Sequence, residues 1–111
     1  MRGRQVFMQS LVLNGADRIF GNPGTTENPL LESLLEFNQV KYITALHESV
    51  AVCAAGLYAQ SSGRTAVANV HVAPGLGNAI GMMYGCLKSQ VPVIVTAGQQ
   101  DTRMRLREPL L

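Results

Sequence analysis

Two acid–base residues stand where apolar segments end, and Glu48 is the first of them. It follows the apolar run 40–46 and opens a helical segment of alanine, valine and glycine. A glutamate in the first turn of a helix is favoured by the helix dipole, by about 0.3–1 kcal/mol. A carboxylate in an apolar crevice instead keeps its proton unless it is paired, and it can exchange that proton with a ring nitrogen of a ligand. Spacing alone leaves both interpretations of Glu48 open.

The two histidines also lie at segment ends. His71 closes the β-branched run 65–70, beside a loop of glycine and proline. It is either hydrogen-bonded to backbone or an acid–base group near a substrate, and both interpretations stay open. His47 directly precedes Glu48, so alternation along a strand sends its side chain to the opposite side. We therefore expect a structural role for His47.

The glycine-rich segment 75–81 reads Gly-Leu-Gly-Asn-Ala-Ile-Gly, between an expected strand and an expected helix. It resembles a dinucleotide fingerprint with one residue too many, and a glycine loop there could cradle a phosphate. The fingerprint also needs an acid about 20 residues on, and Asp101 lies too far along the chain. Glycines that allow tight helix–sheet packing explain the segment equally well. A hydrolase triad is unsupported, since no Gly-x-Ser-x-Gly occurs.

The elements that must position these residues alternate along the chain. A helix ends at Asn14-Gly15, and another begins at Asn28-Pro29, which we interpret as its N-cap and first helical residue. Strands are expected at 18–20, 40–46, 65–70 and 91–96, with later helices at 50–60 and 78–87. Ser62-Gly63 is the expected end of the first of these two helices. Uniformly apolar strands are typical of a parallel sheet covered on both faces. The sequence thus predicts an α/β fold, a parallel sheet flanked by helices.

In such a sheet the loops after the strands gather at one edge, where ligands bind. The expected loops are 22–26, 47–48, 71–77 and 98–101, and they hold both histidines and Glu48. Their convergence is stronger evidence for a ligand site than any one loop is.

Composition limits the classes of function. The chain has 111 residues, enough for one domain at most, and a net charge of +2 without a basic stripe for nucleic acid. No segment has the roughly 18 apolar residues of a membrane span, and no secretory signal is present. Cys53 and Cys86 are expected to be buried thiols in the reducing cytoplasm, without metal-ligand spacing. The charged fraction of 14% is low, which indicates partners that cover the surface.

A set of motifs, in this order, resembles the pyrimidine-binding N-terminal domain of thiamin-diphosphate-dependent enzymes, and most closely the benzoylformate decarboxylase type. The likeness covers about 6–111, essentially the whole chain. Its segments are 20–27 (Phe-Gly-Asn-Pro-Gly-Thr-Thr-Glu), His47-Glu48, His71, 73–79 (Ala-Pro-Gly-Leu-Gly-Asn-Ala) and 95–100 (Val-Thr-Ala-Gly-Gln-Gln). As a set the motifs are highly specific, although each alone is common.

The resemblance implies roles for individual residues. Glu48 matches the glutamate that hydrogen-bonds N1′ of the cofactor's aminopyrimidine and drives its amino–imino tautomerism in decarboxylation of a 2-oxo acid. His71 matches an active-site histidine that exchanges protons with intermediates. Thr25 matches a serine near the substrate carboxylate, so the hydroxyl is kept and a methyl group is added. Pro23, Gly24 and Asn78 match the wall on the pyrimidine side.

The resemblance also implies what lies outside the chain. The family binds the diphosphate through Mg²⁺ in a second domain with a Gly-Asp-Gly motif, which does not occur here. We expect 1–111 to be an incomplete domain, cut at its C-terminal end and inactive alone. Its expected partners are a diphosphate-binding domain of the same or another chain and a 2-oxo acid. A homodimer or homotetramer is expected for the full enzyme, in the cytoplasm, with no nucleic acid and no membrane.

Four alternatives remain. The first is a carboligase domain; acetolactate synthases share the glutamate but usually lack a histidine at the position of His71, which favours a decarboxylase. The second and third are a separate partner subunit and a non-catalytic assembly domain. The fourth is a nucleotide-binding Rossmann domain, which an NAD titration would test.

Overall fold

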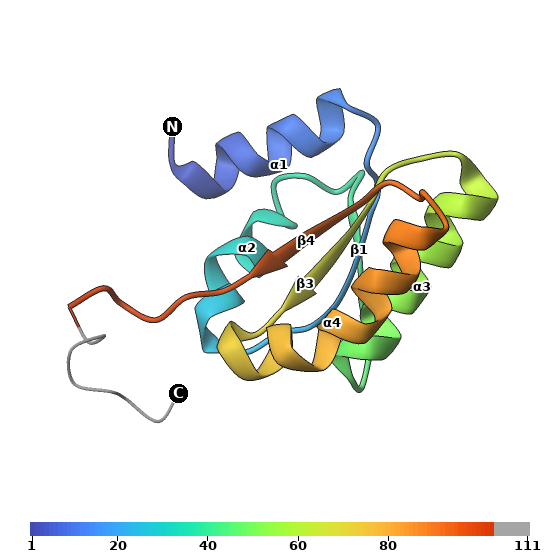
Figure 1. The fold of residues 1–111 in the computed structure, drawn as a ribbon. Coiled ribbons are helices and arrows are strands. Elements are labelled where there is room, and N and C mark those ends of the chain that lie inside the picture. Colours follow the sequence, from blue (N-terminus) through green and yellow to red (C-terminus); the bar gives the residue numbers. More distant parts are fainter. Residues whose placement is uncertain (104–111) are drawn as a thin grey trace.

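The computed structural model describes residues 1–103 and shows strands alternating with helices (Figure 1). The α-helices are α1 (Gly3–Leu13), α2 (Asn28–Ser33), α3 (Glu48–Ser62) and α4 (Val72–Lys88), and a 3-10 turn, η1, covers Thr25–Glu27. The strands are β1 (Arg18–Asn22), β2 (Lys41–Thr44), β3 (Ala66–Val70) and β4 (Val93–Ala97). The predicted α/β class and all four predicted strands are confirmed.

The four strands form one parallel sheet in the order β2-β1-β3-β4. After β1 the chain crosses to β2 on one side, and after β3 it crosses to β4 on the other. Adjacent strands whose connections diverge in this way leave a crevice beyond their carboxyl ends, where open α/β sheets bind ligands. Asn22 ends β1 and His71 follows β3, so both predicted loops lie at this crevice.

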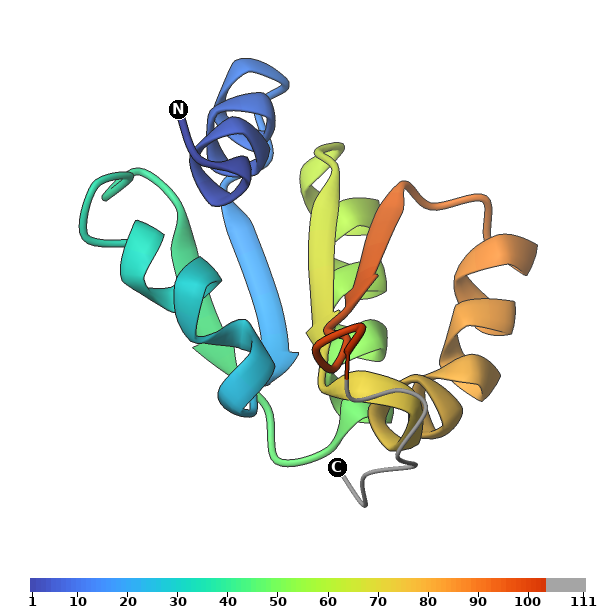
Figure 2. The same ribbon diagram turned by 90° about the vertical axis from the view of Figure 1, so that its left-hand side faces the viewer.

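Helices cover both faces of the sheet, with α1 and α2 on one side and α3 and α4 on the other (Figures 1 and 2). Alternation along the strands divides the core accordingly. Ile19 and Val67 pack beneath α1, with Met8 and Leu11, while the opposite face forms the larger core. That core is rich in alanine, which lets α3 lie close to the strands. Its buried members are Phe20, Ala45, Ala51, Val52, Ala55, Ala59, Ala66, Ala68, Val70 and Ala79.

Helix α3 ends where the sequence predicts it to end. Gly63 adopts a left-handed conformation with φ of 69°, and its N–H donates to the carbonyl of Ala59. Residues with a Cβ are strained in this region, so glycine is the favoured C-cap. Helix α3 also begins at Glu48, two residues before the predicted start, because the His47 side chain caps it.

Two other helix starts also differ from the predicted ones. Helix α4 begins at Val72, so the predicted loop at 71–77 is wrong, and with it the phosphate-cradling glycine loop. The Gly75 N–H already bonds to the His71 carbonyl at 3.0 Å, and Gly75 packs against Val70 and Glu48. Helix α2 begins at Asn28 itself, which is helical rather than its N-cap.

The surface of α3 and α4 differs from expectation at one cysteine. Cys53 is exposed, whereas Cys86 is half-buried, so the prediction of two buried thiols is wrong for Cys53.

Among residues 1–103, none of the helices has the length and apolar character that a membrane span needs. Large apolar side chains point outward along α3 and α4: Val50, Leu57, Leu76, Ile80, Met82, Tyr84 and Leu87.

Candidate active site at the carboxyl edge of the sheet

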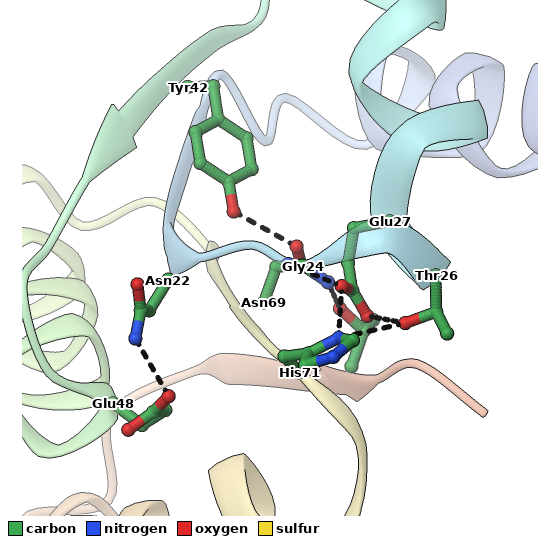
Figure 3. Close-up of polar contacts among 9 residues, drawn as sticks. Asn22, Gly24, Thr26, Glu27, Tyr42, Glu48, Asn69 and His71 are labelled. Carbon is green, nitrogen blue, oxygen red and sulfur yellow. Dashed lines mark hydrogen bonds and ion pairs between the residues drawn. The ribbon is translucent and has the colours of Figure 1, made fainter. Parts of the chain in front are cut away.

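Glu48 is held at the crevice by two amides. Asn22 Nδ2 donates to one carboxylate oxygen at 2.9 Å, and Asn78 Nδ2 donates to the other at 3.0 Å. The amides come from the end of β1 and from α4, so three elements converge on one side chain. Figure 3 shows the contact from Asn22. Glu48 is only 7% exposed, at the N-terminus of α3.

The electrostatics of Glu48 differ from those of a bare carboxylate in an apolar crevice. Burial raises its pKa. The hydrogen bonds from Asn78, from backbone and from Asn22, together with the charge of His47, lower the pKa by more than burial raises it. The net direction is below the ordinary value of a glutamate. The paired case therefore applies, and Glu48 is an ionised acceptor with lone pairs still available.

His47 contributes to the position of Glu48 rather than to a binding surface. Its Nδ1 accepts a hydrogen bond from the Ser49 N–H at 3.2 Å and so caps α3. A side-chain acceptor at this position satisfies one of the free N–H groups of the first turn. The structure thus gives His47 a capping contact, as the sequence led us to expect.

His71 belongs to a second cluster, around the carboxylate of Glu27. Its Nδ1 lies 2.8 Å from Glu27 Oε2 and 3.1 Å from Thr26 Oγ1. Thr26 donates its hydroxyl to Glu27 Oε1 at 2.5 Å, and the Gly24 N–H donates to Oε2 at 2.8 Å. The Glu27 side chain is 2% exposed and that of His71 is 23% exposed. A buried carboxylate thus faces one ring nitrogen of a partly accessible histidine (Figure 3).

Two glycines make this cluster possible. A Cβ on Gly24 would overlap the His71 ring, and a Cβ on Gly98 would overlap Glu27 Oε1 and Thr26 Oγ1. Gly98 follows β4, and its N–H is bonded to the Val70 carbonyl. The carboxylate therefore occupies space that any larger residue at Gly98 would fill.

A row of polar side chains crosses the sheet next to this cluster. The Tyr42 hydroxyl donates to Asn69 Oδ1 at 3.0 Å, and Asn69 Nδ2 donates to Thr96 Oγ1 at 3.0 Å. The Tyr42 ring passes over Gly21, where a Cβ would overlap its hydroxyl. Burial, together with the charge of Glu27, raises the pKa of Tyr42 far above its ordinary value, so the phenol stays a neutral donor.

The predicted site residues divide between these clusters. Glu48 and Asn78 are in contact, and Gly24 lies against His71, with Pro23 half-buried beside it. Thr25 is exposed at the start of η1, and the hydroxyl that contacts His71 is that of Thr26. Thr25 therefore remains a prediction.

The sequence analysis missed Asn22 and Glu27. The signal for Glu27 was its position three residues after Gly24, where a glutamate reaches back to a backbone N–H at a helix start. The signal for Asn22 was a polar side chain at the end of an apolar strand, at the predicted ligand edge. Within 1–103, no group of three or more His, Cys, Asp or Glu is placed to hold a metal ion.

Comparisons with known proteins identify the family to which this fold belongs. The family described as thiamine pyrophosphate enzyme, N-terminal TPP binding domain, matches residues 1–110. Benzoylformate decarboxylase of Pseudomonas aeruginosa is 41% identical over 91 residues, 82% of this chain and 17% of the relative. The acetolactate synthase large subunit of Lactococcus lactis is 36% identical over 97 residues, 87% of this chain and 17% of the relative.

Solved structures give the same result. The structure of benzoylformate decarboxylase from Polynucleobacter necessarius superposes with a TM-score of 0.88 at 34% identity, over 97% of this chain and 20% of that one. A 4-hydroxybenzoylformate decarboxylase from Rhodococcus jostii gives 0.88 at 33% identity, over 96% and 20%. The chain spans about a fifth of the length of these proteins. It belongs to the family of N-terminal TPP-binding domains of thiamine pyrophosphate enzymes.

Proposed function

We propose that this chain is the pyrimidine-binding part of a thiamin-diphosphate-dependent 2-oxo-acid decarboxylase similar to benzoylformate decarboxylase. One observation carries the proposal: a nearly buried Glu48, hydrogen-bonded by Asn22 and Asn78, lies at the ligand edge of the sheet, with His71 at the same edge. The family match supports the cofactor, and the decarboxylase relatives support the reaction.

The residues present fit the aminopyrimidine ring. Glu48 would hold a protonated ring nitrogen through an acceptor that Asn22 and Asn78 keep in one orientation. Pro23, Gly24 and Asn78 would form the wall on that side. When bound, thiamin diphosphate supplies the electron sink for loss of CO₂. The contribution of Glu48 is to fix the ring and to hold a proton at its nitrogen.

His71 would exchange protons with the substrate. Its side chain is partly accessible, and the Glu27 carboxylate occupies Nδ1, so Nε2 is the nitrogen left for an acid–base role. Thr25, exposed at the start of η1, would contact the substrate carboxylate. We expect His71→Ala to slow decarboxylation, and unchanged kinetics would leave His71 a structural residue.

A carboligase similar to acetolactate synthase is the second candidate, because the Lactococcus lactis relative is 36% identical to this chain. Glu48 serves both candidates equally, so the distinction depends on His71. A histidine at the substrate edge favours proton delivery after CO₂ leaves, which is the decarboxylase outcome. A non-catalytic assembly subunit is the third, and the hydrogen-bonded Glu48 and His71 argue against it.

The complete enzyme requires more than this chain. We propose that a diphosphate-binding domain, in the same or another chain, holds the diphosphate and Mg²⁺ and completes the site. The outward apolar side chains of α3 and α4 support such a partner, because an exposed apolar face of this kind marks an interaction surface. A homodimer or homotetramer would supply it, and the chain alone would be inactive.

Product analysis of the complete protein tests the proposal. With thiamin diphosphate and Mg²⁺ present, a panel of aryl and alkyl 2-oxo acids is assayed for CO₂, for aldehyde and for 2-hydroxy-keto products. Aldehyde as the main product confirms a decarboxylase, and coupled products identify the carboligase. Absence of turnover with every substrate, at measured cofactor saturation, would contradict both.

A further inference from the structure

Glu27 is a buried carboxylate that has no role in the proposed function. Its side chain is 2% exposed, yet it makes no ion pair with Lys or Arg among residues 1–103. Carboxylates are almost never buried to this degree unless they are paired. The partner available to Glu27 is the ring of His71, with Nδ1 at 2.8 Å.

The contacts around Glu27 determine the direction of each hydrogen bond. Oε2 accepts from the Gly24 N–H, and Oε1 accepts from the Thr26 hydroxyl. An ionised carboxylate offers acceptors and no donor, so the 2.8 Å contact requires a hydrogen on His71 Nδ1. A neutral imidazole carries one hydrogen, which leaves Nε2 as a bare acceptor.

We infer that Glu27 is the positioning residue for His71, fixing its neutral ring as the Nδ1–H tautomer and presenting Nε2 as the nitrogen that takes up a proton and returns it. This inference rests on the proposed function for its consequence in turnover, whereas the tautomer is inferred from the hydrogen-bonding contacts of Glu27 as a carboxylate. In enzymes and metal sites, the hydrogen bond at one ring nitrogen commonly sets what the other nitrogen can do.

The surroundings keep the carboxylate in this orientation. A Cβ at Gly98 would overlap Oε1, and a Cβ at Gly24 would overlap the imidazole ring, so backbone closes on the pair from two sides. Two further titratable groups lie near the pair within 1–103: the neutral Tyr42 phenol and Arg4, which lines the same cavity as Glu27. Arg4 is itself paired with Glu32. His71 is therefore the titratable group that is hydrogen-bonded to Glu27 and that a change at Glu27 affects directly.

Nitrogen NMR of the unmutated full-length protein tests the tautomer directly. With ¹⁵N-labelled histidine, spectra above the titration midpoint of the ring show which nitrogen carries the hydrogen. We expect the hydrogen on Nδ1 of His71. A hydrogen on Nε2 would overturn the inference, whatever the enzyme is found to catalyse. The result is thus independent of the decarboxylase assignment.

Two substitutions test the consequence. In Glu27→Gln, the amide oxygen can accept from Gly24 and His71 while the NH₂ donates to Thr26, so tautomer and fold should persist without the charge. Glu27→Ala removes the acceptor, and the Nδ1–H form should lose its preference. The exposed Glu36, which accepts from Gln5 at 2.8 Å, gives the matched control Glu36→Gln.

Kinetics complete the test in the full enzyme. For Glu27→Ala we expect kcat to fall about 10- to 100-fold with KM nearly unchanged, the range seen when a carboxylate that orients a metal-bound histidine is lost. Glu27→Gln, which keeps the tautomer, should recover most of this loss, and Glu36→Gln should match the unmutated enzyme. A folded Glu27→Ala enzyme with unchanged kcat, or one in which only KM rises, would overturn the positioning role.

Discussion

The variant Tyr42→Phe removes one hydroxyl group from the polar row beside Glu27 and His71. That hydroxyl donates to Asn69 Oδ1 at 3.0 Å, and Asn69 is 3% exposed, so water has little access to replace the donor. A buried acceptor left without its partner costs about 1–3 kcal/mol. The phenyl ring still fills the space over Gly21, so this lost hydrogen bond should dominate the change in the free energy of unfolding.

Urea denaturation followed by far-UV circular dichroism measures this change. In a domain of this size each kcal/mol corresponds to about 4–8 °C in Tm. The matched control is Tyr84→Phe, because Tyr84 is 61% exposed on α4 and its hydroxyl faces solvent. We expect a lower urea midpoint for Tyr42→Phe at an unchanged m value, and an unchanged urea midpoint for Tyr84→Phe. Equal stability of the two variants would refute the importance of the buried row.

The same variant makes a prediction about alkaline pH. The folded-state pKa of Tyr42 is raised by burial and by the charge of Glu27, whereas the unfolded value is about 10. The folded protein then retains a proton that the unfolded chain loses. The stability from this group is complete below about pH 10 and is lost as pH rises further. Tyr42→Phe should lose less stability than the unmutated protein as pH rises above about 10. Equal losses of stability in the variant and the unmutated protein would contradict the burial of the phenol.

Three further perturbations follow from the structure. Hydrogen bonds hold the pKa of Glu48 below its ordinary value, so the stability that this group contributes is present above about pH 4.3 and is lost as pH falls further. Glu48→Gln should therefore lose less stability than the unmutated protein in acid. Gly98→Ala puts a Cβ onto the Glu27 carboxylate and should cost about 1–3 kcal/mol by calorimetry, together with loss of turnover in the full enzyme. Gly63→Ala forces a left-handed alanine, with φ of 69°, and should lower stability by about 1–2 kcal/mol while kcat stays unchanged, since Gly63 caps α3 at the opposite end from Glu48.

The fold was predictable because its signals are local. Uniformly apolar runs indicated strands covered on both faces, and the sheet places Ile19 and Phe20 in different cores. Gly63 marked a helix end through its own backbone preference. Glu48 at the carboxyl edge followed from the topology that all parallel sheets share.

The rest depended on contacts between distant segments. Helix α4 starts at Val72, and its Gly75 packs against Val70 and Glu48, although the proline and glycine of this segment are typical of a loop. Glu27 resembled a solvated glutamate at a helix start. Its burial depends on Gly98 after β4 and on His71 after β3, and neither neighbour is visible in the sequence near Glu27.

The most direct test of the proposed function is turnover of the Glu48→Gln variant in the complete enzyme. Glutamine keeps the size of the side chain and removes the carboxylate that Asn22 and Asn78 hold at the crevice. With thiamin diphosphate, Mg²⁺ and a 2-oxo acid that the unmutated enzyme decarboxylates, we predict that turnover is abolished while circular dichroism shows an intact fold. A folded variant that keeps most of its activity would contradict the role of Glu48 in activating the cofactor.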